Sequence, residues 1–183
     1  MTRVYTKQNI AVLEQLEATG RYVAKRKYVQ NDLDDDAEMM AIVYDELVKN
    51  HPRLEDKPED AEVPVWVSFS LQATMCPERG FVILELEVPD TEITHVNIAK
   101  WGQMLNYGYL PENDEDRKRH RDLMEQYGVD DATAVMTNFY PMLKKEILNS
   151  WSRLFDDSVS LGSDASYGLL WEIKKELVFS IDS

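Results

Sequence analysis

Two segments in which apolar and polar residues alternate constrain the fold of this chain more than any other feature. Residues 64–70 read PVWVSFS, and residues 81–88 read FVILELEV. Successive side chains of a β-strand point to opposite faces, so each segment predicts a strand with one apolar face. Pro89 has no N–H to donate to a sheet and ends the second strand. We therefore expect these two strands to form the middle of a sheet.

The remaining apolar residues predict helices and further short strands. A strand is expected at 3–5, and Thr6 is expected to cap a helix that Gly20 ends. The pattern then predicts an exposed strand at 22–29, a helix from Asp34 to His51, a strand at 93–98, and helices at 100–107, 112–127 and 141–155. Residues 167–181 predict one or two closing strands, with a helix through 171–177 as the alternative. This order predicts an α+β fold: one domain over residues 1–183, with a mixed, mostly antiparallel sheet and flanking helices.

The charge of the chain excludes some classes of partner. Its 183 residues include 34 acidic and 20 basic ones, which gives a net charge of −14. A surface this acidic repels nucleic-acid backbone and anionic lipid. No apolar run approaches the roughly 20 residues that span a bilayer. The N-terminus has no secretory apolar region, and Cys76 is the single cysteine. We expect a cytoplasmic protein whose partner is another protein or a small molecule.

No familiar catalytic or metal-binding motif is present. The chain lacks the phosphate-binding loop, the dinucleotide-binding glycine pattern and the hydrolase nucleophile motif. His51, His95 and His120 stand outside zinc-ligand spacing, so no metal is expected. His120 lies within RKRHR and is expected to face solvent, with intrahelical ion pairs explaining the basic run. Glu85 and Glu87 share one strand face, as expected for the solvent-exposed face of a sheet.

Aromatic residues gather around one asparagine. Trp66, Trp101, Asn106 and Tyr107 predict either a packed aromatic core or the lining of a small-ligand pocket. The second interpretation would make the protein a ligand sensor.

Six local patterns, in order through nearly the whole chain, carry a family resemblance: YTKQ, VPVWVSF, ILELEVPD, KWGQMLNYGYLP, SWSRLFD and LLWEIKKELV. In these patterns the chain resembles an uncharacterised bacterial family, domain of unknown function 3841. That resemblance implies no established activity.

A second likeness is to the ADP-ribosyltransferase-like superfamily, through RVYTKQ, ILELEVPD and WEIKKELV. It implies that Tyr5, Thr6 and Gln8 lie near a nicotinamide dinucleotide, NAD, and that Ser68 is the hydroxyl of the middle strand. Glu172 or Glu176 would then be the catalytic carboxylate that orients the ribose, with Glu172 favoured. Arg3 is only an approximate stand-in for the first-strand basic residue or histidine of that group.

The sequence is therefore compatible with three functions. The enzyme hypothesis is a transferase that uses NAD or another nucleotide, with Glu172 catalytic. The alternatives are an acidic protein-interaction or regulatory module without catalysis, and a small-ligand sensor that uses Trp101 and Asn106.

Overall fold

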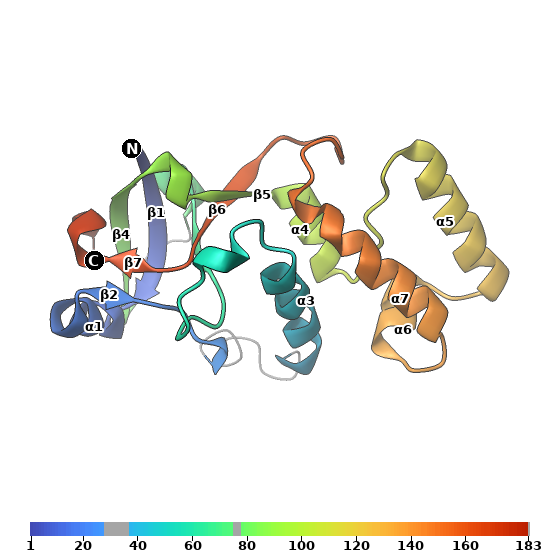
Figure 1. The fold of residues 1–183 in the computed structure, drawn as a ribbon, viewed down its shortest axis with the longest axis horizontal. Helices are drawn as coiled ribbons and strands as arrows, with labels where there is room; N and C mark the ends of the chain where they lie inside the picture. The colour runs from blue at the N-terminus through green and yellow to red at the C-terminus, as the bar shows by residue number, and fades with distance from the viewer. Residues whose placement is uncertain (28–36, 75–77, 183) are drawn as a thin grey trace. The chain divides into compact units, whose positions relative to one another are not determined.

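The computed structural model describes residues 1–27, 37–74 and 78–182 of the chain. They belong to two compact units, each made from segments that are not contiguous in sequence (Figure 1). The sheet unit comprises Met1–Val29, Glu55–His95 and Ser166–Ser183, and the helical unit comprises Gln30–Leu54 and Val96–Ala165. The single domain over residues 1–183 stays a prediction.

Short antiparallel strands build the sheet unit. The longest ladder has the order β1-β4-β8, and β1 pairs with β4 along its whole length, from Thr2↔Val88 to Asn9↔Phe81. A second sheet has the order β3-β6-β5, and β2 pairs with β7. The strands are β1 (Thr2–Asn9), β2 (Arg21–Tyr22), β3 (Val65–Val67), β4 (Phe81–Val88), β5 (Thr94–Asn97), β6 (Ser166–Leu170), β7 (Ile173–Lys174) and β8 (Val178–Asp182). With the helices described below, these sheets confirm an α+β fold.

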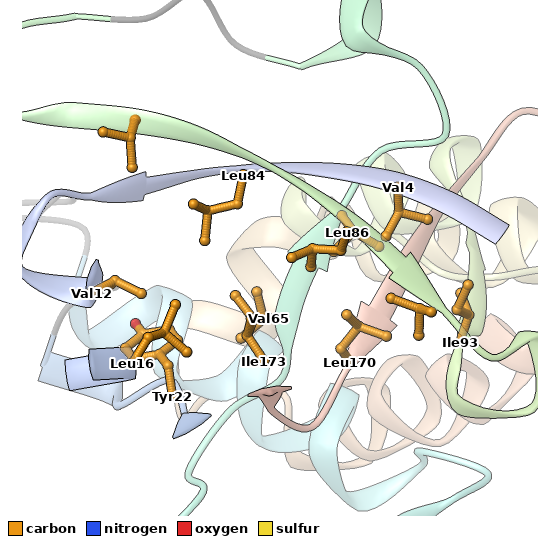
Figure 2. Close-up of a cluster of buried hydrophobic side chains, with 13 residues drawn as sticks. Val4, Val12, Leu16, Tyr22, Val65, Leu84, Leu86, Ile93, Leu170 and Ile173 are labelled. Atoms are coloured by element: carbon orange, nitrogen blue, oxygen red, sulfur yellow. The ribbon is translucent and has the colours of Figure 1, made fainter. Parts of the chain in front are cut away.

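The hydrophobic core of the sheet unit follows the alternation of the sequence. The apolar face that the alternation predicts for β4 is buried, and it consists of Val82, Leu84, Leu86 and Val88. Ile83, on the opposite face, is buried as well. Figure 2 shows Leu84 and Leu86 on the same side of the sheet as Val12 and Leu16 of α1 (Ala11–Thr19). Gly20 ends α1 with a φ of 76°, a left-handed conformation that glycine adopts without a Cβ clash.

Two predictions near the N-terminus need correction. Thr6 is not a helix cap, because β1 continues to Asn9 and its register with β4 supplies backbone partners along all eight residues. The buried Thr6 hydroxyl instead donates to the Trp66 carbonyl at 2.8 Å. The strand expected at 22–29 is wrong in extent and exposure, because β2 ends at Tyr22, and Tyr22 and Val23 are buried. The helix start expected at 34–36 lies outside the described residues.

The helical unit contains α3 (Ala37–Lys49), α4 (Ile98–Leu105), α5 (Asp114–Tyr127), α6 (Asp131–Met136) and α7 (Pro141–Ser150). The Asn113 side chain caps α5 by accepting from the Asp116 N–H, and left-handed Gly128 ends the helix. The helix expected at 141–155 tightens at Trp151 into a 3₁₀ turn, Trp151–Phe155. The six-residue α6 has no counterpart in the sequence prediction, because it is too short to show a helical apolar period.

The structure of residues 167–181 decides between the predicted strands and the alternative helix. Strands β6, β7 and β8 run through it, and a 3₁₀ turn at Lys175–Leu177 interrupts them, so a helix through 171–177 is wrong. Further 3₁₀ turns lie at Leu54–Asp56, Leu71–Ala73 and Asp90–Glu92. Among the described residues, none of the helices combines the length and apolar character that a membrane crossing requires.

Candidate functional site

A pocket of about 630 Å³ opens in the helical unit. Its wall is formed by α4, the loop that follows α4, one face of α5 and the start of α6. The polar lining consists mainly of Gln103, Asn106, Arg117, His120, Arg121 and Asp131. This volume is within the range of pockets that hold small molecules, a few hundred to about 1,000 Å³.

The loop after α4 is held in a defined conformation. Tyr107 adopts a φ of 57°, a left-handed conformation that costs a non-glycine residue about 1 kcal/mol or more. The Trp151 indole N–H donates to the Gly108 carbonyl at 2.8 Å, and the Leu110 N–H donates to the Ser150 hydroxyl at 2.9 Å. Contacts from α7 and the turn after it therefore compensate the strained backbone and fix this wall of the pocket.

His120 is the central polar residue of the pocket wall. Its side chain is 7% exposed, with Nε2 at 2.8 Å from Asp131 Oδ1 and Nδ1 at 3.2 Å from Glu146 Oε1. Its ring stacks on Tyr109 with the centroids 3.9 Å apart. The imidazole of α5 thus connects α6 and α7, an arrangement that we call the histidine clamp: His120, Asp131 and Glu146.

The histidine clamp favours the charged imidazolium. Burial lowers the pKa of His120, but the hydrogen bonds to Asp131 and Glu146 outweigh this effect, and the pKa is raised overall. The sequence prediction of an exposed His120 is wrong, because the face of α5 that carries His120 and Met124 is buried. Intrahelical pairing explains only part of the basic run, such as Arg119 with Asp116 at 2.9 Å.

A second set of contacts supports the stacked tyrosine. The Tyr109 hydroxyl donates to Asp116 Oδ2 at 2.9 Å and accepts from Arg119 Nη2 at 3.0 Å. Burial raises the pKa of Tyr109, so the phenol stays protonated in the neutral range. Arg153 donates to the Leu110 carbonyl at 2.7 Å. These bonds fix the orientation of the ring against which His120 lies.

The polar groups of this pocket differ in how far protein partners already engage them. A histidine between two carboxylates can transfer protons, but here both ring nitrogens are already hydrogen-bonded. In the described part of the chain, no group of three or more His, Cys, Asp or Glu side chains could hold a metal ion. The amides and guanidinium groups on the wall can instead bind and orient a polar molecule.

Asn106 and Trp101, the ligand-binding residues predicted from the sequence, both lie in the helical unit. Asn106 lines the pocket, with its amide donating to the Gly102 carbonyl at 2.7 Å. Trp101 is buried and meets the Tyr44 ring edge-on, with the centroids 5.6 Å apart. Trp66 belongs to the sheet unit, where it meets Tyr167 edge-on. The aromatic residues therefore pack in separate clusters, and the asparagine faces the pocket.

Four other predicted ligand-binding residues lie together in the sheet unit. Tyr5 and Ser68 exchange two backbone hydrogen bonds of 2.8 Å. The Gln8 amide donates to the Thr6 hydroxyl at 2.8 Å, and the Ser68 hydroxyl donates to the Ser70 carbonyl at 3.0 Å. The side-chain groups of Thr6, Gln8 and Ser68 thus bond to neighbouring protein groups. Their predicted ligand-binding role stays a prediction.

Glu172, the predicted catalytic residue, is held by an ion pair. Arg21 Nη1 lies 2.8 Å from Glu172 Oε2, and Arg21 Nη2 lies 2.6 Å from Asp60. The register Val65↔Leu170 and Val67↔Gly168 carries Ser68 past one end of the β3–β6 pair and Glu172 past the other. The structure does not bring Glu172 together with Ser68.

The sequence prediction missed His120 and Asp131 as pocket residues. Charged neighbours on both sides of His120 masked its position on the apolar face, four residues before Met124. The i, i+4 spacing of His120 and Met124 was the sequence signal that could have placed His120 on the buried face of the helix. No comparable signal marked Asp131, because the short helix that it begins was itself not predicted.

The comparisons with known proteins are consistent with the resemblance seen in the sequence. A family model described as a domain of unknown function (DUF3841) matches residues 3–179. No curated protein and no solved structure matches the chain. Because the family match covers nearly all of the 183 residues, the chain belongs to the DUF3841 family.

Proposed function

We propose that this protein binds a small polar molecule in the pocket of the helical unit. The observation that carries this proposal is the convergence of Asn106, Arg117, Arg121 and the buried His120 on one pocket of about 630 Å³. Small-molecule sites combine an apolar wall with a few fixed polar groups. Ala99 and Met124 contribute apolar surface here, and the amide and guanidinium groups supply the polar contacts.

Pre-organisation supports the same proposal. The left-handed backbone of Tyr107 lies directly beside Asn106, and strained residues of this kind concentrate at binding and catalytic sites. The stacked and hydrogen-bonded His120 keeps the opposite wall in place. The loop after α4 and the His120 ring would therefore need little further ordering on binding, which reduces part of the entropy cost.

The test is a screen of polar metabolites by two-dimensional NMR with a pocket-filling variant. Binding should shift the backbone amides of Asn106, Arg117 and Arg121. Ala99→Phe places an aromatic ring in the pocket and should abolish those shifts. Ala18→Phe, at an exposed position on α1, is the matched control and should leave them unchanged. Ligands that bind both variants equally well would exclude this pocket as the site.

The other sequence-based functions remain predictions. The NAD-using transferase rests on Tyr5, Thr6, Gln8, Ser68 and Glu172, and the acidic interaction module rests on the net charge of −14. A cytoplasmic location likewise stays a prediction.

A further inference from the structure

We propose that the ligand of this pocket carries an oxyanion, a carboxylate or a phosphate group, that Arg117 and Arg121 bind together. This inference rests on the proposed function of the pocket and names the chemical class of its ligand. The two residues lie four positions apart on α5, so their side chains leave the same face of the helix. Both line the pocket. The planar guanidinium group matches a carboxylate or phosphate with two parallel hydrogen bonds.

Among the described residues, neither arginine has a close hydrogen-bond or ion-pair partner. Arg117 Nε lies 3.7 Å from Asp114 Oδ1, and that aspartate side chain is 99% exposed. Arg121 lies 3.8 Å from Asp122 and 3.9 Å from Glu125, which are also exposed. Exposed ion pairs of this length contribute about 0–1 kcal/mol. An anionic ligand can therefore replace these partners at little cost.

Two nearby arginines, Arg119 and Arg153, instead make close bonds to protein groups. Arg119 Nη2 lies 2.9 Å from Asp116 and 2.9 Å from Glu146, and these carboxylates raise its pKa far above the ordinary value. Arg153 donates to the Leu110 carbonyl within the fold. Arg119 and Arg153 are thus held by the fold, whereas Arg117 and Arg121 line the pocket and have only weak protein partners.

The carboxylates of the pocket are already occupied by protein donors. Asp131 accepts from the Tyr109 N–H at 2.7 Å and pairs with His120 at 2.8 Å. Asp130 caps α6 by accepting from the Thr133 N–H at 2.7 Å. The binding capacity that remains on this wall therefore lies mainly with the cationic donors, which favours an anion over a cation.

The acidic character of the chain means that an anion would bind only where cationic groups gather locally. A chain with a net charge of −14 repels small anions over most of its surface. Anion binding at Arg117 and Arg121 would be local and would weaken with added salt, because salt screens exposed charges.

The experiment is an NMR titration of the full chain with inorganic phosphate and, separately, with acetate at constant ionic strength. We expect saturable shifts of the backbone amides of Arg117, Arg121 and Asn106. The R117Q/R121Q double variant should weaken binding of the preferred anion by about tenfold or more, since hydrogen bonds to charged groups are the stronger ones. Comparing the two anions identifies which group the site takes.

The matched control is the K118Q/K145Q double variant. It also removes two positive charges, but from exposed positions that do not line the pocket. It should leave the affinity within about twofold, because neither lysine lines the pocket and solvent and salt screen exposed charges. Equal weakening by both double variants, or shifts that never saturate, would overturn the oxyanion inference.

A parallel titration with neutral and cationic fragments separates this inference from the proposed function. If those fragments bind the pocket and neither anion does, the pocket is a binding site but its ligand is not anionic. If no probe of any charge shifts the pocket residues, the proposed function and the oxyanion inference both fail. Thermal melting of the two double variants checks that each remains folded.

Discussion

His120 Nε2 lies 2.8 Å from Asp131 Oδ1, and this contact joins the middle of α5 to the first residue of α6. The same aspartate accepts from the Tyr109 N–H through its other oxygen. One carboxylate therefore fixes both the imidazole and the loop that carries its stacking partner. The position of the pocket wall depends on this relationship.

Removing the imidazole should make stability less dependent on pH. Hydrogen bonds to Asp131 and Glu146 raise the pKa of His120 in the folded state despite the opposing effect of burial. A raised folded pKa means that the stabilisation is complete below the unfolded value of about 6.5 and is lost as pH rises through the folded value. Urea unfolding of the wild type should show this loss, and His120→Gln should not.

At a pH of about 6, His120→Gln should reduce the free energy of unfolding by about 1–3 kcal/mol, because two buried hydrogen bonds to carboxylates are weakened. His95→Gln is the control, since that side chain is exposed. If His120→Gln kept the full pH dependence of the wild type, the histidine clamp would not be its source.

Two glycine substitutions should have different consequences. A methyl group at Gly108 would overlap the flexible side chain of Gln103, which can move toward solvent. Gly108→Ala should therefore change stability by less than about 1 kcal/mol and alter ligand binding by displacing Gln103.

At Gly168, the added carbon would lie 2.7 Å from Val67 Cγ2 and 2.9 Å from Ile93 Cγ2. Gly168→Ala should cost about 1–3 kcal/mol, because these side chains have little room to move in a packed sheet. Thermal unfolding of both alanine variants measures the contrast. A larger loss at Gly108 than at Gly168 would contradict it.

The buried Lys100 should be important for stability. Its ammonium group donates to the Asp156 carbonyl at 2.6 Å and to the Arg153 carbonyl at 3.2 Å, while burial lowers its pKa. Lys100→Met keeps the apolar stem but removes the donor, so we expect a loss of about 1–3 kcal/mol in urea unfolding. Lys145→Met, at an exposed position on α7, should change stability by less than about 0.5 kcal/mol. Equal effects would contradict a role for the Lys100 hydrogen bonds.

Glu172→Gln distinguishes a structural role from the predicted catalytic one. The ion pair with Arg21 is partly exposed, and Arg21 also pairs with Asp60, so the substitution should cost no more than about 1 kcal/mol. The transferase hypothesis additionally requires that the wild type binds NAD and that the variant loses NAD-dependent turnover. Calorimetry with NAD and a turnover assay provide the measurements. An absence of NAD binding by the wild type would count against the transferase.

Local sequence patterns predicted an element correctly where a single physical requirement determines its structure. The alternation through Phe81–Val88 predicted both the strand and its buried face, since period-two burial is a property of the strand itself. Gly20 marked the end of the first helix correctly, because the left-handed conformation there favours glycine. Asn106, predicted from its aromatic neighbours to bind a ligand, lines the pocket, and its binding role stays a prediction.

The sequence by itself determined the α+β class, the main strand, most of the helices and membership in the DUF3841 family. Only the tertiary structure decided that Thr6 lies in a strand, that His120 is buried, and that Asn106, Arg117 and Arg121 share a pocket. Thr6 follows a long-range register with β4, which overrides its local capping preference. His120 is buried because its carboxylate partners come from two other helices, 11 and 26 residues away along the chain. Contacts at such separations leave no periodic signal in a single sequence, so only the folded chain reveals them.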